Sequence, residues 1–146
     1  MTARVWPRRL ITGLYWFWAL QFALGAITKY WPGETFFGPP YSMKFADWGY
    51  PSWMRFVIGG LEGVSAILLV IPSRRTRFVG ATILAFVLTG AVTTHIINHD
   101  VLSQSWAAPT HLVIAGAVAL ANWPADWREL LRRAVPPTTR AAPMTE

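Results

Sequence analysis

The sequence contains no cysteine and few charged residues, and both absences narrow the range of functions. Of its 146 residues none is Cys, 14% are charged and 53% are hydrophobic. Without cysteine the chain has no Cys-x-x-Cys redox pair, no thiolate metal site and no attachment point for c-type haem. A soluble domain has about a quarter of its residues charged. The composition therefore indicates a membrane protein that has no reactive thiol of its own.

Four apolar segments hold most of the hydrophobic residues. They cover about residues 10–28, 53–71, 78–97 and 106–123, and each is close to the roughly 20 residues with which a helix crosses a bilayer. Helices are expected because lipid cannot satisfy the backbone polar groups of an isolated strand. Prolines stand near the segment ends, at Pro7, Pro72, Pro109 and Pro124. We therefore expect one all-α domain over residues 1–135, an integral membrane four-helix bundle.

The basic residues predict the direction of the spans, because cytoplasmic loops of membrane proteins are enriched in Lys and Arg. With both termini in the cytoplasm, the outer side holds only Lys29, Lys44 and Arg55, whereas ten arginines lie inside: Arg4, Arg8, Arg9, Arg74, Arg75, Arg77, Arg128, Arg132, Arg133 and Arg140. The alternative, a signal peptide cut near residues 23–26, would leave three spans and place an arginine-rich segment outside. The net charge of +6 is expected to meet lipid headgroups rather than nucleic acid.

Three segments lie outside the predicted spans. Residues 125–135 have an apolar face opposite arginines and predict an interfacial amphipathic helix at the C-terminal side, and residues 136–146 resemble a disordered tail. The segment of residues 30–52, called the outer segment below, carries eight aromatic residues: Tyr30, Trp31, Phe36, Phe37, Tyr41, Phe45, Trp48 and Tyr50. It is either an aromatic belt at headgroup depth or a lid over a cavity.

Each predicted span carries a polar side chain in the outer half of the bundle: Gln21, Glu62, His95 and His111. Glu62 is the only acidic residue within any predicted span. A carboxyl group at that depth costs at least ~2.5 kcal/mol to insert, so it should face the bundle interior. Helix rise places the four side chains at similar depth. They form either a ligand site or a set of hydrogen bonds that serves only helix packing.

A carboxyl group and imidazoles in a medium of low dielectric suit the binding of a carbonyl or hydroxyl group with proton transfer. A quinone or quinol is the leading candidate, and its expected contacts are Gln21, Glu62, His95, His111, Trp48 and Tyr50. Other amphipathic lipids and small apolar solutes fit the same groups. His95 and His99 have a spacing compatible with metal ligation, but no third ligand has a clear spacing, and we predict no metal site. A b-type haem held by His95 and His111 is a further alternative that we do not favour.

The order of several features resembles the DoxX or DoxX-like family of small four-span bacterial membrane proteins. These features are the aromatic outer segment ending in Gly49-Tyr50-Pro51, a second span with Gly60-Leu61-Glu62-Gly63 that ends at Pro72, and a third span ending in His95. The resemblance covers residues 10–123. It implies a four-helix membrane bundle, and relatives are described as subunits of quinone-reducing or other membrane redox assemblies. Only Glu62 and His95 match positions of the family pattern.

We therefore expect a protein of the bacterial inner membrane that acts as a quinone-linked accessory subunit of an oxidoreductase. In this hypothesis Glu62 and His95 contact the quinone or relay its protons, and a partner subunit carries the redox centre. The expected partners are membrane lipids together with that subunit or a second copy of the chain. Two alternatives stay open: a binding or transport protein for a lipid or apolar solute, and a structural subunit without a ligand.

Overall fold

The computed structural model describes residues 5–36 and 38–126, which form helices and, apart from one isolated bridge between Thr35 and Gly38, no β-structure. The helices are α1 (Val5–Tyr30), α2 (Tyr41–Asp47), α3 (Met54–Val70), α4 (Arg74–Ile97), α5 (Leu102–Ser105) and α6 (Ala107–Ala121). The all-α prediction is confirmed. Most of the predicted interfacial helix and the whole predicted tail lie outside the described residues.

The four long helices coincide with the four apolar segments, with shifted ends. Helix α4 begins at Arg74 rather than near residue 78, since a polar, arginine-rich turn continues the helix beyond its apolar part. The fourth segment holds α6, and a short helix that was not expected, α5, precedes it and is joined to it by Trp106. Within the described residues, α1 over Arg8–Tyr30 and α4 are long and apolar enough to cross a membrane. Helices α3 and α6 have 17 and 15 residues, which correspond to lengths of about 25 and 22 Å.

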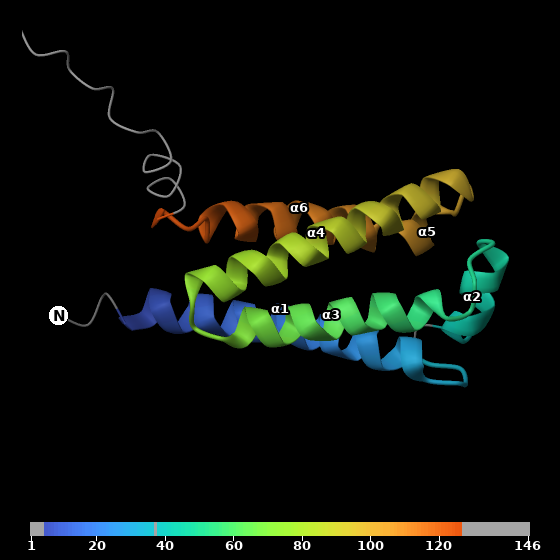
Figure 1. Ribbon diagram of the computed structural model, residues 1–146, viewed down its shortest axis with the longest axis horizontal. Coiled ribbons are helices and arrows are strands. Elements are labelled where there is room, and N and C mark those ends of the chain that lie inside the picture. Colours follow the sequence, from blue (N-terminus) through green and yellow to red (C-terminus); the bar gives the residue numbers. More distant parts are fainter. Residues whose placement is uncertain (1–4, 37, 127–146) are drawn as a thin grey trace, which may run out of the picture.

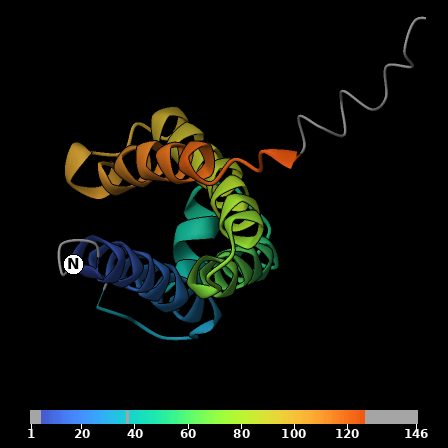
Figure 2. The same ribbon diagram turned by 90° about the vertical axis from the view of Figure 1, so that its left-hand side faces the viewer.

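The long helices follow one another as antiparallel neighbours. Helix α1 packs on α3, α3 on α4, and α4 on α6. Seen along the helices, this row curves into an arch with α1 and α6 at its two ends (Figure 2). Helices α2 and α5 lie at the end of the bundle opposite the N-terminus (Figure 1). That end, called the distal end below, therefore collects the outer segment, the C-terminus of α4 and the start of α6.

The interior is built from small residues and leucines together with a few aromatic rings, among them Trp18 and Phe22. Leu69, Leu84, Ala81 and Ala115 are fully buried. Many other large apolar side chains point outward, among them Leu14, Phe17, Leu20, Ile67, Phe86, Val113 and Leu120. Small residues between helices and large apolar residues on the outside are the arrangement expected where lipid surrounds a bundle.

Polar side chains hold the helices together at the end of the bundle near the N-terminus. The Arg77 guanidinium lies 4.0 Å from the Tyr15 ring centroid and donates to the Leu69 carbonyl at 3.2 Å. The buried Asn122 donates through Nδ2 to the Tyr15 hydroxyl at 2.6 Å. Helices α1, α3, α4 and the end of α6 are thereby fixed to one another near the N-terminus.

Candidate functional site

The four polar side chains expected in one layer occur in three separate contacts. Glu62 bonds to Lys29, Gln21 to His111, and His95 to Asp100. Each contact joins different elements, and no hydrogen bond between Glu62 and His95 is present among the described residues. The layer is therefore divided, and each contact has its own chemistry.

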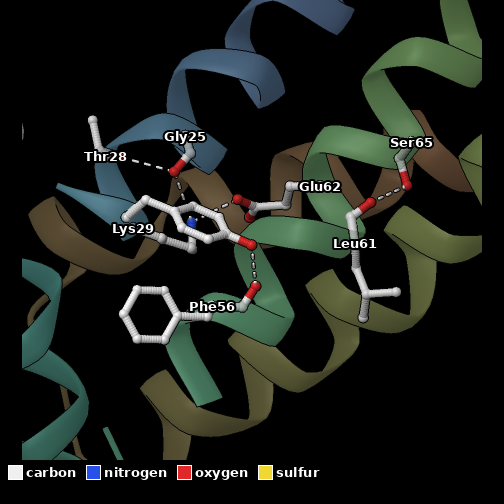
Figure 3. A network of polar contacts seen from close by, with 8 residues as sticks. Gly25, Thr28, Lys29, Phe56, Leu61, Glu62 and Ser65 are labelled. Carbon is white, nitrogen blue, oxygen red and sulfur yellow. Dashed lines mark hydrogen bonds and ion pairs between the residues drawn. The ribbon is translucent and has the colours of Figure 1, made fainter. Parts of the chain in front are cut away.

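Glu62 forms a buried ion pair between α3 and α1 (Figure 3). Lys29 Nζ lies 2.7 Å from Glu62 Oε2, and each side chain is only 9% exposed. The ammonium also donates to the Gly25 carbonyl at 3.4 Å. Gly25 has no side chain to occupy the space beside the carboxylate, where a Cβ would lie 3.5 Å from Oε2. The carboxyl group thus has the partner that burial requires, and its charge is balanced within the protein.

Sequence reasoning missed Lys29 as this partner. Its position at the end of an apolar segment is typical of a residue that points to the headgroups, yet its side chain turns back along α1 and is buried. The neighbouring ammonium of Lys44 on α2 lies 5.1 Å from the Tyr41 ring centroid, and Lys29 lies 4.6 Å from the same centroid. Burial and then the charge of Lys29 lower the pKa of Lys44.

Gln21 and His111 connect the two ends of the arch. Gln21 Oε1 lies 2.9 Å from His111 Nε2, and the Ala107 carbonyl lies 2.8 Å from His111 Nδ1. The edge of the imidazole also meets the buried Phe22 ring, with centroids 5.5 Å apart. Both ring nitrogens of His111 therefore have protein partners. An axial bond from His111 to a haem iron would require the loss of one of these contacts.

His95 lies at the C-terminus of α4, where the chain turns in a Schellman motif. The His99 amide donates to the Ile96 carbonyl at 3.2 Å, and the Asp100 amide donates to the His95 carbonyl at 3.1 Å. These two bonds define the motif, which places the residue after the cap in the left-handed region. His99 occupies that position with φ of 54°. The turn brings the side chain of Asp100 back against His95, with Oδ2 2.7 Å from Nδ1.

The outer segment folds over this turn. Trp48 presents its ring edge-on to the His95 imidazole, with centroids 5.4 Å apart and planes at 86°. The Tyr50 hydroxyl lies 2.8 Å from Thr94 Oγ1. Since the Thr94 hydroxyl donates its own proton to the Gly90 carbonyl, Tyr50 is the donor in this bond. Phe45 of α2 is buried. The outer segment is thus anchored to His95 and to the adjacent Thr94.

An open recess of about 540 Å³ adjoins this turn at the distal end. Its lining comes from the end of α4, from α5 and from the start of α6: Val92, His95, Ile96, His99, Asp100, Leu102, Ser105, Trp106 and Pro109. We call it the distal recess. Of the residues predicted for the site, only His95 lines the distal recess. Trp48 contacts His95, and Tyr50 bonds to the adjacent Thr94. Gln21, Glu62 and His111 belong to the other two contacts.

The distal recess combines apolar walls with two imidazoles and a carboxylate. His95 Nδ1 is taken by Asp100, and His95 Nε2 makes no hydrogen bond with the described part of the chain. It is the ring nitrogen left for a ligand. Sequence reasoning missed Trp106 as a lining residue and the pairing of Asp100 with His95. The described residues contain no group of three His, Cys, Asp or Glu side chains that could hold a metal ion.

A family model described as the DoxX-like family matches residues 13–121, which include α3, α4 and α6 in full and α1 without its first eight residues. No curated protein and no solved structure matches the chain.

Proposed function

This chain belongs to the DoxX-like family, and from that premise we propose that it is a four-span protein of the bacterial inner membrane that binds the ring of a quinone or quinol in the distal recess. Both termini lie in the cytoplasm in this proposal, which places the distal end at the outer face. The chain acts as an accessory subunit, and the centre that exchanges electrons with the ring belongs to a partner oxidoreductase. The membrane character itself follows from the family and the apolar helices.

The observation that carries the proposal is the position of His95 in the distal recess. An aromatic ring with polar oxygens needs apolar walls and a few placed polar groups. Ile96, Leu102 and Trp106 provide such walls, and the imidazole of His95 provides the polar group. Because the recess opens at the end of the bundle, a ring carried on an isoprenoid tail would reach it from the outer leaflet.

The remaining predicted residues support this recess at a distance. Trp48 packs against His95 and Tyr50 bonds to the adjacent Thr94, so the outer segment serves as a lid that holds the imidazole. Glu62, Gln21 and His111 already have protein partners. We assign them to holding α1 against α3 and α6, rather than to contact with the ring.

The proposal is tested by asking what the protein binds and where. The protein purified in mild detergent is extracted with organic solvent, and the extract is analysed for quinones by mass spectrometry. A photoreactive azidoquinone then maps the site, and we expect labelled peptides within residues 92–109. His95→Gln should reduce labelling at least tenfold, whereas Thr93→Ala, at an exposed position two residues earlier on α4 that does not line the recess, should leave it unchanged.

Other results would favour the other functions. A co-purified lipid that is not a quinone would indicate a binding or transport protein for that lipid. A protein that carries no ligand and whose labelling does not respond to His95→Gln would indicate a structural subunit, and the proposal would be abandoned.

A further inference from the structure

The bond between His95 and Asp100 determines which proton the imidazole carries. An ionised carboxylate can only accept a hydrogen bond, so Nδ1 of His95 is the donor to Asp100 Oδ2 across 2.7 Å. In a neutral imidazole the other nitrogen then has no proton. His95 Nε2 therefore offers a lone pair, and the group that meets it must be a donor.

Two features keep His95 in this arrangement. The Schellman motif fixes the backbone of Asp100 relative to His95 through the bond from its amide to the His95 carbonyl. The corresponding side chains frequently make an apolar contact in this motif, whereas here they form an acid–imidazole pair in which each side chain is only 17% exposed. The edge-on Trp48 ring limits rotation of the imidazole.

We propose that the distal recess selects the reduced, hydroxyl-bearing form of its ring ligand, with His95 Nε2 accepting the hydroxyl hydrogen and Asp100 acting as the positioning residue. This inference rests on the proposed function and names its substrate class, a quinol or related phenol. A quinone carbonyl or a methyl ether would place an acceptor against an acceptor, which leaves both groups without a hydrogen bond.

The same arrangement can accept the proton outright. When the O–H bond breaks, the proton moves to Nε2, the bonding electron pair stays on the ring oxygen, and the ring becomes an anion beside an imidazolium. Asp100 balances the positive charge of that imidazolium. His99 also lines the distal recess, but no carboxylate among the described residues bonds to its ring, so its tautomer is not fixed in this way.

The first test measures the tautomer and needs no ligand. The full chain, labelled with ¹⁵N-histidine and reconstituted in nanodiscs, is studied by NMR at about pH 8, where an unperturbed imidazole is neutral. His95→Gln identifies the His95 signals by their loss. We expect a protonated Nδ1 and an unprotonated Nε2 in the wild-type protein. In Asp100→Asn the amide can donate to Nδ1, so the proton should move to Nε2.

The second test measures selectivity. Binding of a short-chain hydroquinone is compared, without oxygen, with binding of its dimethyl ether and of the corresponding quinone. A lost hydrogen bond of about 1.4 kcal/mol corresponds to a factor of ten, so the hydroquinone should bind about tenfold more tightly than either. Asp100→Asn should abolish or reverse this preference. Thr93→Ala, at an exposed position that does not line the distal recess, should retain it.

The outcomes separate the two proposals. A wild-type His95 that is protonated at Nε2 would overturn the inference whatever binds. Equal binding of the three rings in both wild type and Asp100→Asn would overturn it too, while leaving quinone binding intact. If no ring binds, the proposed function fails and the tautomer measurement still decides whether Asp100 fixes His95. Circular dichroism checks that each variant is folded.

Discussion

At the residue scale, the ion pair of Lys29 and Glu62 explains how two charged residues are tolerated inside an apolar bundle. Removing one member of a buried pair typically costs about 3–5 kcal/mol, because the other charge is left uncompensated. Lys29→Met should therefore lower the thermal unfolding midpoint strongly, as measured by intrinsic fluorescence in detergent. Glu62→Gln should have a smaller effect in the same direction, since the amide oxygen can still accept from Nζ.

The double variant Lys29→Met, Glu62→Leu is the matched control. It removes both charges, and apolar side chains that replace a buried pair are often neutral or stabilising. We therefore expect its unfolding midpoint to lie well above that of Lys29→Met alone. If the single and double variants were equally unstable, the loss would come from packing around Lys29 rather than from an unpaired charge.

The same scale shows which site residues a sequence can reveal. Glu62 and His95 stand out because they interrupt apolar runs, where an ionisable group has no ordinary role. Their partners do not stand out. Lys29 and Asp100 lie at segment ends, where charged residues are common. Lys29 reaches Glu62 only because its side chain turns back along α1. Asp100 reaches His95 only because α4 ends in a Schellman motif. Such pairing depends on geometry that residue spacing does not contain.

At the element scale, the contact between α1 and α3 depends on Gly59. A Cβ at this position would lie 2.9 Å from Tyr30 Cε2 and 3.2 Å from the Ala26 carbonyl oxygen. The backbones of α1 and α3 therefore approach closely at Gly59, three residues before Glu62 of the ion pair. The Tyr30 hydroxyl also donates to the Phe56 carbonyl here, at 2.8 Å. Gly59→Ala should destabilise the protein by about 1–3 kcal/mol, as overpacking does.

Gly116 on α6 offers the comparison for this substitution. Nothing lies within 4 Å of the position that a Cβ would take there, so Gly116→Ala should gain up to about 1 kcal/mol from helix propensity alone. Both variants are compared by their unfolding midpoints in one detergent. Similar shifts of the unfolding midpoint in the two variants would show that the α1–α3 contact has room for a methyl group at position 59.

Helix positions follow from the sequence more closely than helix ends do. The apolar segments locate α1, α3, α4 and α6, because membrane helices need continuous apolar residues. The short helix α5 before Trp106 and the arginine-rich first turn of α4 were not predicted. Both lie where a helix leaves the apolar region, so local turns and polar contacts, rather than hydrophobicity, decide where it begins. Helix α2 within the outer segment was not predicted for a similar reason: only seven residues long, it is stabilised by packing of Phe45.

At the scale of the whole molecule, the two ends of the bundle carry different chemistry. The end near the N-terminus holds Arg74, Arg75 and Arg77 together with the end of α6. The distal end holds the lid, the His95–Asp100 pair and the distal recess. Arginines at one end and a recess that opens at the other support the proposed orientation, in which the arginines face the cytoplasm and the ligand arrives from the outer leaflet.

The number of spans gives the last prediction, and the lack of native cysteine makes it easy to measure. Single cysteines are introduced at Glu34, Ser73, Ser103 and Ala125 and labelled with a membrane-impermeant maleimide. Since α3 returns the chain to the end of the bundle near the N-terminus (Figure 1), four spans place positions 34 and 103 outside and positions 73 and 125 inside. In intact spheroplasts the maleimide should therefore label only positions 34 and 103, and in permeabilised ones it should label all four positions.

If only α1 and α4 crossed the membrane, positions 34 and 73 would be labelled in intact spheroplasts instead, and the recess beside α5 would face the cytoplasm. The contrast between Ser73 and Ser103 thus decides both the topology and the side from which the distal recess is reached.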